Sequence, residues 1–206
     1  MNKFKINANE YLKHNIISYY HIGYTGYKTL GNPDYLNDLK NTFGDSSKEK
    51  LDNAKKQLYH VLKTDLSSFS RDFTVCIVPR SKAENTYSDN QLLFKKTVQS
   101  IIHEFGFQDG SNYIIRHTDT KTTHLAHSPK AAQYAGNGSM PYIGITKDTC
   151  NISDNIRGKR ILLIDDIYTA GVNIDEDAIQ TLLHNGAKFI NFYAVGKTVW
   201  HIQKML

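Results

Sequence analysis

The feature that most constrains this chain is a short apolar run that ends in two acids. Residues 161–164 read ILLI, and Asp165 and Asp166 follow them directly. A run that is apolar at every position is buried on both faces, which is typical of a central strand in a parallel sheet. Because ligands of such sheets bind beyond the carboxyl ends of the strands, we expect both acids to lie in a ligand crevice.

From residue 73 onward, segments with the pattern of strands alternate with segments that have the pattern of helices. Ser88 and Gln91 form a capping box that predicts the start of one helix, and Gly106 is a typical end for it. This alternation predicts the α/β class, with a doubly wound parallel sheet. The expected strands cover residues 73–79, 112–117, 141–146, 160–165 and 188–198, and the expected helices cover residues 88–106 and 174–187.

The N-terminal third is expected to be helical instead. Helices are predicted over residues 34–43 and 48–66, and Ser46 with Glu49 forms a capping box for the second of them. The apolar residues of this second helix fall on one face, so it should pack against a core. We therefore expect two units, an N-terminal helical hood of residues 1–70 and an α/β core of residues 71–206.

Composition limits the classes of function. The two cysteines, Cys76 and Cys150, are too few for a disulfide scaffold, and neither belongs to a Cys-x-x-Cys pair. The net charge of +5 and the pI of about 9.0 favour an anionic partner, which is either nucleic acid or a small phosphorylated molecule. No apolar run is long enough to span a bilayer, and the N-terminus does not read as a signal peptide. We expect a cytoplasmic protein without a membrane partner.

The residues after the two acids form an uncharged turn, Tyr168 to Asn173, that leads into a helix. Backbone amides at the N-terminus of a helix bind anions. We expect Asn173 to cap this helix, with Glu176 closing a capping box. Carboxylates suited to hydroxyl groups thus stand a few residues from amides suited to a phosphate. A sugar 5-phosphate has both of these groups.

The segment ILLIDDIYTAGVN, residues 161–173, closely resembles the phosphoribosyl-pyrophosphate (PRPP) motif of the type I phosphoribosyltransferases. The nearest members are those like competence protein F and the amidophosphoribosyltransferases, and the resemblance extends over about residues 74–197. It implies the fold of that family, with an N-terminal hood. It also implies that Asp165 and Asp166 hold the ribose hydroxyls. The 5-phosphate would be wrapped by Tyr168, Thr169, Ala170, Gly171, Val172 and Asn173.

Two further segments resemble parts of the same family. VPRSKAE, residues 78–84, follows the first strand of the core, as the pyrophosphate loop of the family does. Its residues Arg80, Ser81 and Lys82 offer donors to a diphosphate. The polar residues 118–140 resemble a mobile loop that closes over PRPP. Arg116 at the start of this loop and Lys121 within it are then implied as catalytic, together with Asp165 and Asp166.

The resemblance implies transfer of a 5-phosphoribosyl group from PRPP to a nitrogen acceptor, with release of pyrophosphate. This is a reaction of nucleotide metabolism. Mg²⁺ would bind the diphosphate and the ribose hydroxyls, and would contact Asp165 and Asp166 indirectly through those hydroxyls or water. The acceptor is not specified by any motif in the chain.

Two other functions stay open. Ala170 stands where a second Thr is common in the motif, and Asn173 stands where Thr or Ser is common. These departures favour a non-catalytic protein that senses PRPP or a nucleotide. The basic pI and the tyrosine-rich residues 19–28 allow a nucleic-acid-linked role, such as competence or a prokaryotic defence effector, although the sequence contains no recognised nucleic-acid motif. A homodimer stays open as well.

Overall fold

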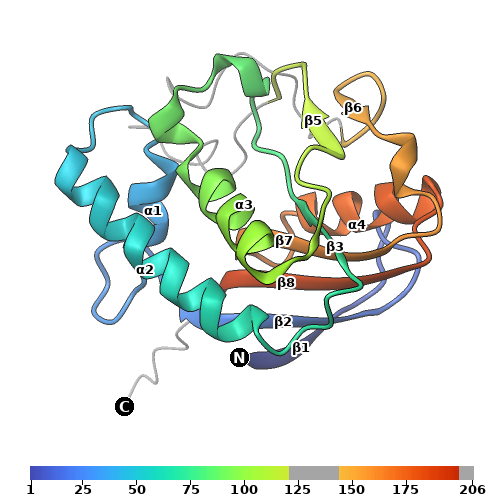
Figure 1. Ribbon diagram of the computed structural model, residues 1–206, viewed down its shortest axis with the longest axis horizontal. Helices are drawn as coiled ribbons and strands as arrows, with labels where there is room; N and C mark the ends of the chain where they lie inside the picture. Colours follow the sequence, from blue (N-terminus) through green and yellow to red (C-terminus); the bar gives the residue numbers. More distant parts are fainter. Residues whose placement is uncertain (121–143, 200–206) are drawn as a thin grey trace.

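The computed structural model describes residues 1–120 and 144–199 (Figure 1). Within these residues, a mixed six-stranded sheet has the strand order β1-β2-β8-β7-β3-β4. β1 pairs with β2 in antiparallel orientation, whereas the other neighbouring strands of this sheet pair in parallel. The strands are β1 Asn2–Ile6, β2 Ile16–Tyr24, β3 Thr74–Ile77, β4 Gln108–Asp109, β7 Arg160–Tyr168 and β8 Phe189–Thr198.

Helices cover both faces of this sheet (Figure 1). One face packs against α1 (Tyr35–Lys40), α2 (Lys48–Leu66) and α3 (Leu93–Phe105), and the other face packs against α4 (Ile174–His184). No helix in the described ranges is long and apolar enough to cross a membrane. The chain therefore has the expected α/β architecture with a mostly parallel sheet.

The apolar run in β7 explains how the two layers are held together. Leu162 and Ile164 join the apolar cluster under α1, α2 and α3, whereas Ile161 and Leu163 join the cluster under α4. All four side chains have an exposed fraction of 0%. Burying one such side chain contributes about 1.5–3 kcal/mol. The expectation of a central strand buried on both faces is confirmed.

The N-terminal region differs from the expected helical hood. Residues 34–43 and 48–66 do contain helices, but residues 2–24 form β1 and β2 and not helices. β2 pairs with β8, so the sheet takes strands from both sides of the boundary expected at residue 70. β2 reads IISYYHIGY, and β-branched and aromatic residues of this kind favour strands once a neighbouring strand is present.

Two strands of the expected parallel sheet are also corrected. β5 (Ile114–Arg116) is a strand as expected, but in the described part it pairs antiparallel with β6 (Cys150–Ile152) in a separate small sheet. The strand expected over residues 141–146 is wrong for residues 144–146, which form no strand, and residues 141–143 lie outside the described residues. The small sheet lies above the main one in Figure 1.

Helix ends follow the expected signals with one shift. The capping box of Ser88 and Gln91 is confirmed, and it opens a 3-10 turn directly before α3. Gly106 ends α3 in the left-handed conformation, with φ 68°. At α2, however, the capping residue is Ser47 rather than Ser46, since the Ser47 hydroxyl accepts from the backbone N–H of Lys50 at 3.3 Å.

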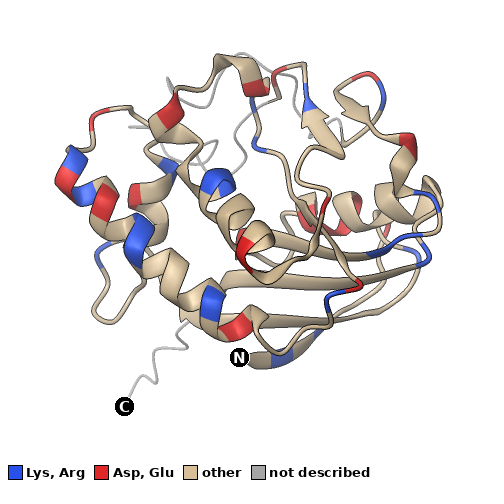
Figure 2. Cartoon of the chain, viewed as in Figure 1, with Lys and Arg blue, Asp and Glu red and all other residues tan. Residues whose placement is uncertain are grey.

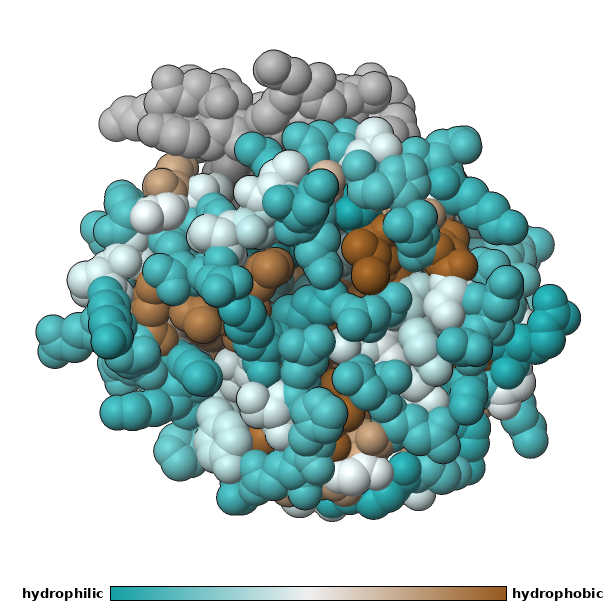
Figure 3. Space-filling view, turned by 45° about the horizontal axis from the view of Figure 1, so that its top comes forward, coloured by the Kyte–Doolittle hydropathy of each residue, from teal (hydrophilic) through white to brown (hydrophobic). Residues whose placement is uncertain are grey.

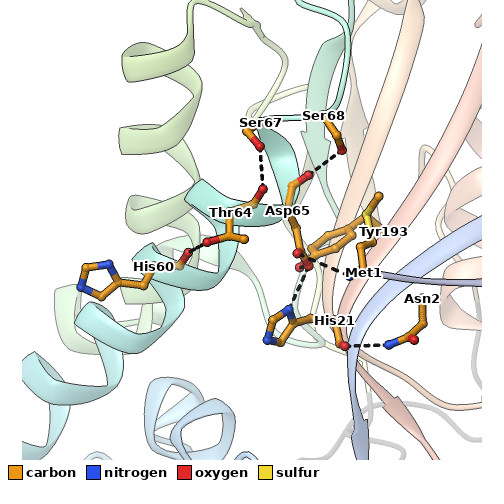
Figure 4. A network of polar contacts seen from close by, with 9 residues as sticks. All are labelled: Met1, Asn2, His21, His60, Thr64, Asp65, Ser67, Ser68 and Tyr193. Atoms are coloured by element: carbon orange, nitrogen blue, oxygen red, sulfur yellow. Dashed lines mark hydrogen bonds and ion pairs between the residues drawn. The ribbon is translucent and has the colours of Figure 1, made fainter.

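A buried polar network ties β2, α2 and β8 together (Figure 4). The Asp65 carboxylate lies 3.0 Å from Nδ1 of His21 and accepts from the Tyr193 hydroxyl at 2.9 Å. The ammonium group of Met1 lies 3.9 Å away. Burial works to raise the pKa of Asp65, but the hydrogen bonds from His21 and Tyr193 outweigh it and hold this pKa below its usual value.

The surface carries mixed charge rather than one dominant sign. Figure 2 shows Lys and Arg interspersed with Asp and Glu along α2, as expected for a solvated helix face. Figure 3 shows a mostly hydrophilic face on which apolar side chains form separate patches. The positive net charge is therefore spread over the surface and does not by itself mark a binding site.

Candidate active site

β7 carries both acids of the motif and continues beyond them to Tyr168. The strand therefore does not end at the acids, as the sequence suggested. Neighbouring residues of a strand point to opposite faces, and the two carboxylates accordingly have different partners. Asp166 lies 3.2 Å from the ammonium of Lys40 at the end of α1, and Asp165 is hydrogen-bonded to the carboxyl group of Asp175 in α4.

Both acids nevertheless line one cleft, which has a volume of about 420 Å³. The cleft lies at the carboxyl ends of β3 and β7, where ligands of parallel sheets bind. Its walls come from α1, from the loop after β3 and from the turn after β7. Its charged or polar lining residues include Lys40, Arg80, Ser81, Lys82, Asp165, Asp166, Thr169 and Asp175.

A smaller chamber of about 60 Å³ adjoins the cleft under the loop after β3. It shares Lys40, Arg80, Lys82 and both acids of β7 with the cleft. Its other walls are mainly apolar and come from α1, β3, α3 and β5. Arg116, expected as a catalytic residue, lines this chamber, where it supports the loop after β3 from below.

Hydrogen bonds hold the loop after β3 in place. The Arg80 guanidinium stacks on the Tyr87 ring at 4.2 Å and donates to the Gln91 carbonyl oxygen at 2.5 Å. Nε of Arg116 donates to the Arg80 carbonyl oxygen at 2.8 Å. The amide and hydroxyl of Thr120 donate to the Ser81 carbonyl oxygen at 2.7 and 2.8 Å. This loop is thus held on several sides before any ligand arrives.

The acids of the cleft have strongly perturbed protonation. Burial, followed by the charge of Asp166, raises the pKa of Asp165 to about 7. Burial and the charge of Asp165 raise the pKa of Asp175 as well. For Lys40, burial works to lower the pKa, but the charges of Asp166 and Asp165 outweigh it and raise the pKa. The cleft therefore contains a carboxyl group that changes charge near neutral pH.

The turn after β7 contributes fewer side chains than expected. Among the described residues that line the cleft, the turn provides Thr169 and Val172. Tyr168, Ala170, Gly171 and Asn173 are not among them. The Tyr168 ring is buried against Phe4 and Phe192, and its hydroxyl donates to Glu176 at 2.9 Å. Any contact of these four residues with a phosphate would come from the backbone.

The expected cap of α4 is wrong. Asn173 occupies the N-cap position with φ 67°, and its side chain makes no capping hydrogen bond within the described structure. Its amide group instead donates to the Gly171 carbonyl oxygen at 3.3 Å, while its Oδ1 accepts from Nδ2 of Asn9 at 3.0 Å. Glu176 pairs with Tyr168 and closes no capping box. The first-turn amides of α4 have no acceptor inside the helix, and that of Glu176 is bonded to its own carboxylate, which leaves the amides before Glu176 for an anion.

Sequence reasoning missed Lys40, Tyr87 and Asp175. Lys40 comes from the N-terminal region and reaches the cleft only through the packing of α1, so no local pattern marks it. Asp175 lies two residues after the motif, in the first turn of α4. Its position so close to the motif could have marked it as a residue of the cleft. The expected catalytic residue Lys121, together with most of the expected mobile loop, lies outside the described residues.

No protein-family model matches the chain, and no curated protein matches it significantly. Within residues 1–120 and 144–199, no three His, Cys, Asp or Glu side chains are grouped so that they could hold a metal ion by themselves. What the cleft can bind therefore follows from its own residues.

Proposed function

We propose that this protein is similar in fold and activity to the type I phosphoribosyltransferases. It binds PRPP in the cleft at the carboxyl end of β7 and transfers the 5-phosphoribosyl group to a nitrogen acceptor. The observation that carries the proposal is that Asp165 and Asp166 line one cleft with Arg80 and Lys82. Two carboxylates suit neighbouring ribose hydroxyls, and two cations suit a diphosphate.

The turn after β7 supplies the site for the 5-phosphate. Thr169 and Val172 line the cleft, and α4 begins directly after them. The first-turn amides of α4 and the helix dipole favour an anion at this point. Asp175 and Glu176 stand in the same turn and oppose an anion when they are charged; burial raises the pKa of both groups.

The reaction breaks the bond between C1 of the ribose and the pyrophosphate oxygen, which keeps the electron pair. A bond forms between C1 and the acceptor nitrogen, which loses a proton. The transition state carries positive charge on the ribose ring, and the carboxylates of Asp165 and Asp166 stabilise that charge. Arg80 and Lys82 balance the charge that develops on the leaving pyrophosphate, and the loop that holds them is already ordered by Tyr87 and Arg116.

The residues of the cleft fit Mg²⁺ that arrives with its substrate. Mg²⁺ keeps several waters and needs only one or two carboxylates beside substrate phosphates. Asp165 and Asp166 provide such carboxylates, while the described residues offer no complete metal cage. When bound, the ion would neutralise part of the pyrophosphate charge. The chain's own residues would contact it through ribose hydroxyls or water.

The proposal is tested by measuring PRPP binding by calorimetry and pyrophosphate release in the presence of Mg²⁺ and a panel of bases and ammonia. We expect release with at least one acceptor, and its loss in the double variant Asp165→Asn/Asp166→Asn. Asp72→Asn is the matched control, because Asp72 precedes β3 at the other end of the sheet and pairs with Arg160. Equal release from the wild type and the double variant would overturn the enzymatic proposal.

A second candidate is a protein that binds PRPP without turnover and acts as a sensor. The ion pair between Lys40 and Asp166, at 3.2 Å, favours it. An acid whose charge is neutralised by a neighbour stabilises a positive ribose ring less well. Saturable PRPP binding without pyrophosphate release, for every acceptor tested, is the result that this candidate requires.

A further inference from the structure

Asn173, at the start of α4, has a backbone conformation that needs support. Its φ of 67° lies in the left-handed region, which asparagine adopts more readily than most residues but less readily than glycine. Its side chain is engaged on both sides, since Nδ2 donates to Gly171 and Oδ1 accepts from Asn9. The side chain of Asn173 is therefore used to hold the turn and not to line the cleft.

Asn9, which supplies the second of these bonds, lies in the loop between β1 and β2. Its Oδ1 accepts from the backbone N–H groups of Tyr11 and Leu12 at 2.8 and 3.0 Å. Because these two donors fix the position of the oxygen, Nδ2 of Asn9 has to point the other way, toward Asn173. The hydrogen bond between the two asparagines, at 3.0 Å, is thus pre-oriented.

The loop that carries Asn9 is itself fixed to α4. The backbone N–H of Lys13 donates to the side-chain oxygen of Gln180 at 2.9 Å. Leu12 has an exposed fraction of 0% and packs in the apolar cluster that contains Ala178 and Ile179. These contacts fix the loop to α4 and hold Asn9 beside the turn that precedes this helix.

We infer that Asn9 is a positioning residue for the phosphate-binding turn: it holds Asn173 in the left-handed conformation that directs the first amides of α4 at the ligand. This inference rests on the proposed function, because it concerns the phosphate end of the same cleft. It assigns to the β1–β2 loop, which is far from the motif in sequence, control over the affinity for the 5-phosphate. Asn9 does not touch the ligand.

The test uses Asn9→Asp, which keeps the oxygen for Tyr11 and Leu12 but replaces the donor to Asn173 by a second acceptor. Asn15→Asp is the matched control. Asn15 lies in the same loop, its Oδ1 accepts from the N–H of Ala8 at 2.8 Å, and the change adds the same charge. The probes are ribose 5-phosphate and inorganic pyrophosphate, with affinities measured by calorimetry. We expect Asn9→Asp to weaken binding of ribose 5-phosphate about five- to tenfold, the effect of one lost hydrogen bond.

Binding of pyrophosphate, at the loop after β3, should stay unchanged in both variants, and Asn15→Asp should bind both probes like the wild type. In an Asn173→Gly background, where glycine adopts the left-handed conformation without a side chain, Asn9→Asp should have no further effect. Equal weakening of both probes by Asn9→Asp would indicate a general loss of structure and would overturn the inference.

A ligand-free measurement separates this inference from the proposed function. In NMR spectra, the backbone amide signals of Gly171 and Asn173 should shift in Asn9→Asp and not in Asn15→Asp. Unchanged signals in Asn9→Asp would overturn the positioning role, whatever the ligand is. The signals could shift in Asn9→Asp while the wild type binds neither PRPP nor ribose 5-phosphate. That pair of results would uphold the role of Asn9 in positioning the turn and would refute the proposed function.

Discussion

Replacing Asp165 by Asn should stabilise the fold, and more so at high pH than at low pH. In the folded protein the pKa of this carboxyl is raised from 3.8 to about 7, chiefly by burial and then by the charge of Asp166. A raised carboxyl pKa means that the folded state binds the proton more tightly than the unfolded chain does. The contribution of Asp165 to stability is therefore complete below about pH 3.8 and is lost as the pH rises through about 7.

The size of the effect follows from the two pKa values of Asp165. Moving the pKa from 3.8 to about 7 corresponds to about 4 kcal/mol, at 1.36 kcal/mol for each tenfold change in proton affinity. The Asp165 side chain is only half-buried, and its proton binding depends on that of Asp175, so we expect about half of this value. The asparagine variant has no such charge, and its side-chain oxygen can still accept from the protonated carboxyl of Asp175.

The assay is urea denaturation of the wild type and of Asp165→Asn. We expect the difference in the free energy of unfolding to favour the variant, and to grow by about 1–3 kcal/mol from pH 5 to pH 8. Asp166→Asn is the contrasting variant, because Asp166 pairs with Lys40 and its removal leaves a half-buried ammonium beside Asp165. A pH-independent effect of Asp165→Asn, or a loss of stability at pH 8, would refute the reasoning.

Other changes should act by different physical means. Lys40→Met should lower stability by about 1–3 kcal/mol at pH 8 in urea denaturation, because it leaves Asp166 without its cation, and Lys40→Arg should retain most of the stability. Asp65→Asn should cost about 2–3 kcal/mol at pH 7, since it breaks the contact with His21. Because the pKa of Asp65 is lowered in the folded protein, its contribution to stability is present above pH 3.8, the usual pKa of this group, and is lost as the pH falls through the lowered value. A loss of stability in Asp65→Asn that stays the same at low pH would contradict this. Gly110→Ala should lower the stability measured by thermal unfolding by about 1–3 kcal/mol, because the added methyl would lie within 3 Å of the buried side chains of β3. If the variant melts at the same temperature as the wild type, the structure around Gly110 can shift to make room for the methyl.

Much of the core could be predicted from local patterns. Leu162 and Ile164 alternate with Ile161 and Leu163 in a run that is apolar throughout, and such a run identifies a central strand without further information. The helices at α2, α3 and α4 have apolar positions on one face and recognisable ends. β1 and β2 were missed because β2 depends on β8, a partner far away in the sequence. Strand propensity shows its effect only when such a partner is present.

The part of the candidate site that lies at the ends of strands could be predicted from the sequence. Asp165 lies near the carboxyl end of β7, and Arg80 and Lys82 follow β3, whose carboxyl end lies at the same edge of the sheet. A prediction of the strands was therefore enough to bring them into one cleft. Lys40 and Asn9 reach the same region through the packing of α1 and of the β1–β2 loop. No sequence pattern around Lys40 or Asn9 indicates these contacts, because they form only in the tertiary structure.

The continuation of β7 through its two acids has a consequence for how the cleft works. Asp166 faces α1 and is held by Lys40, whereas Asp165 faces α4 and is held by Asp175. A ligand that engages both carboxylates thus contacts both helical layers of the fold at once. One acid is thus paired with a cation and the other with a carboxyl group, although the two are neighbours in the sequence. Their roles toward a ribose should differ accordingly, because Asp166 is paired with a cation, whereas the raised pKa of Asp165 makes its charge depend on pH near neutrality.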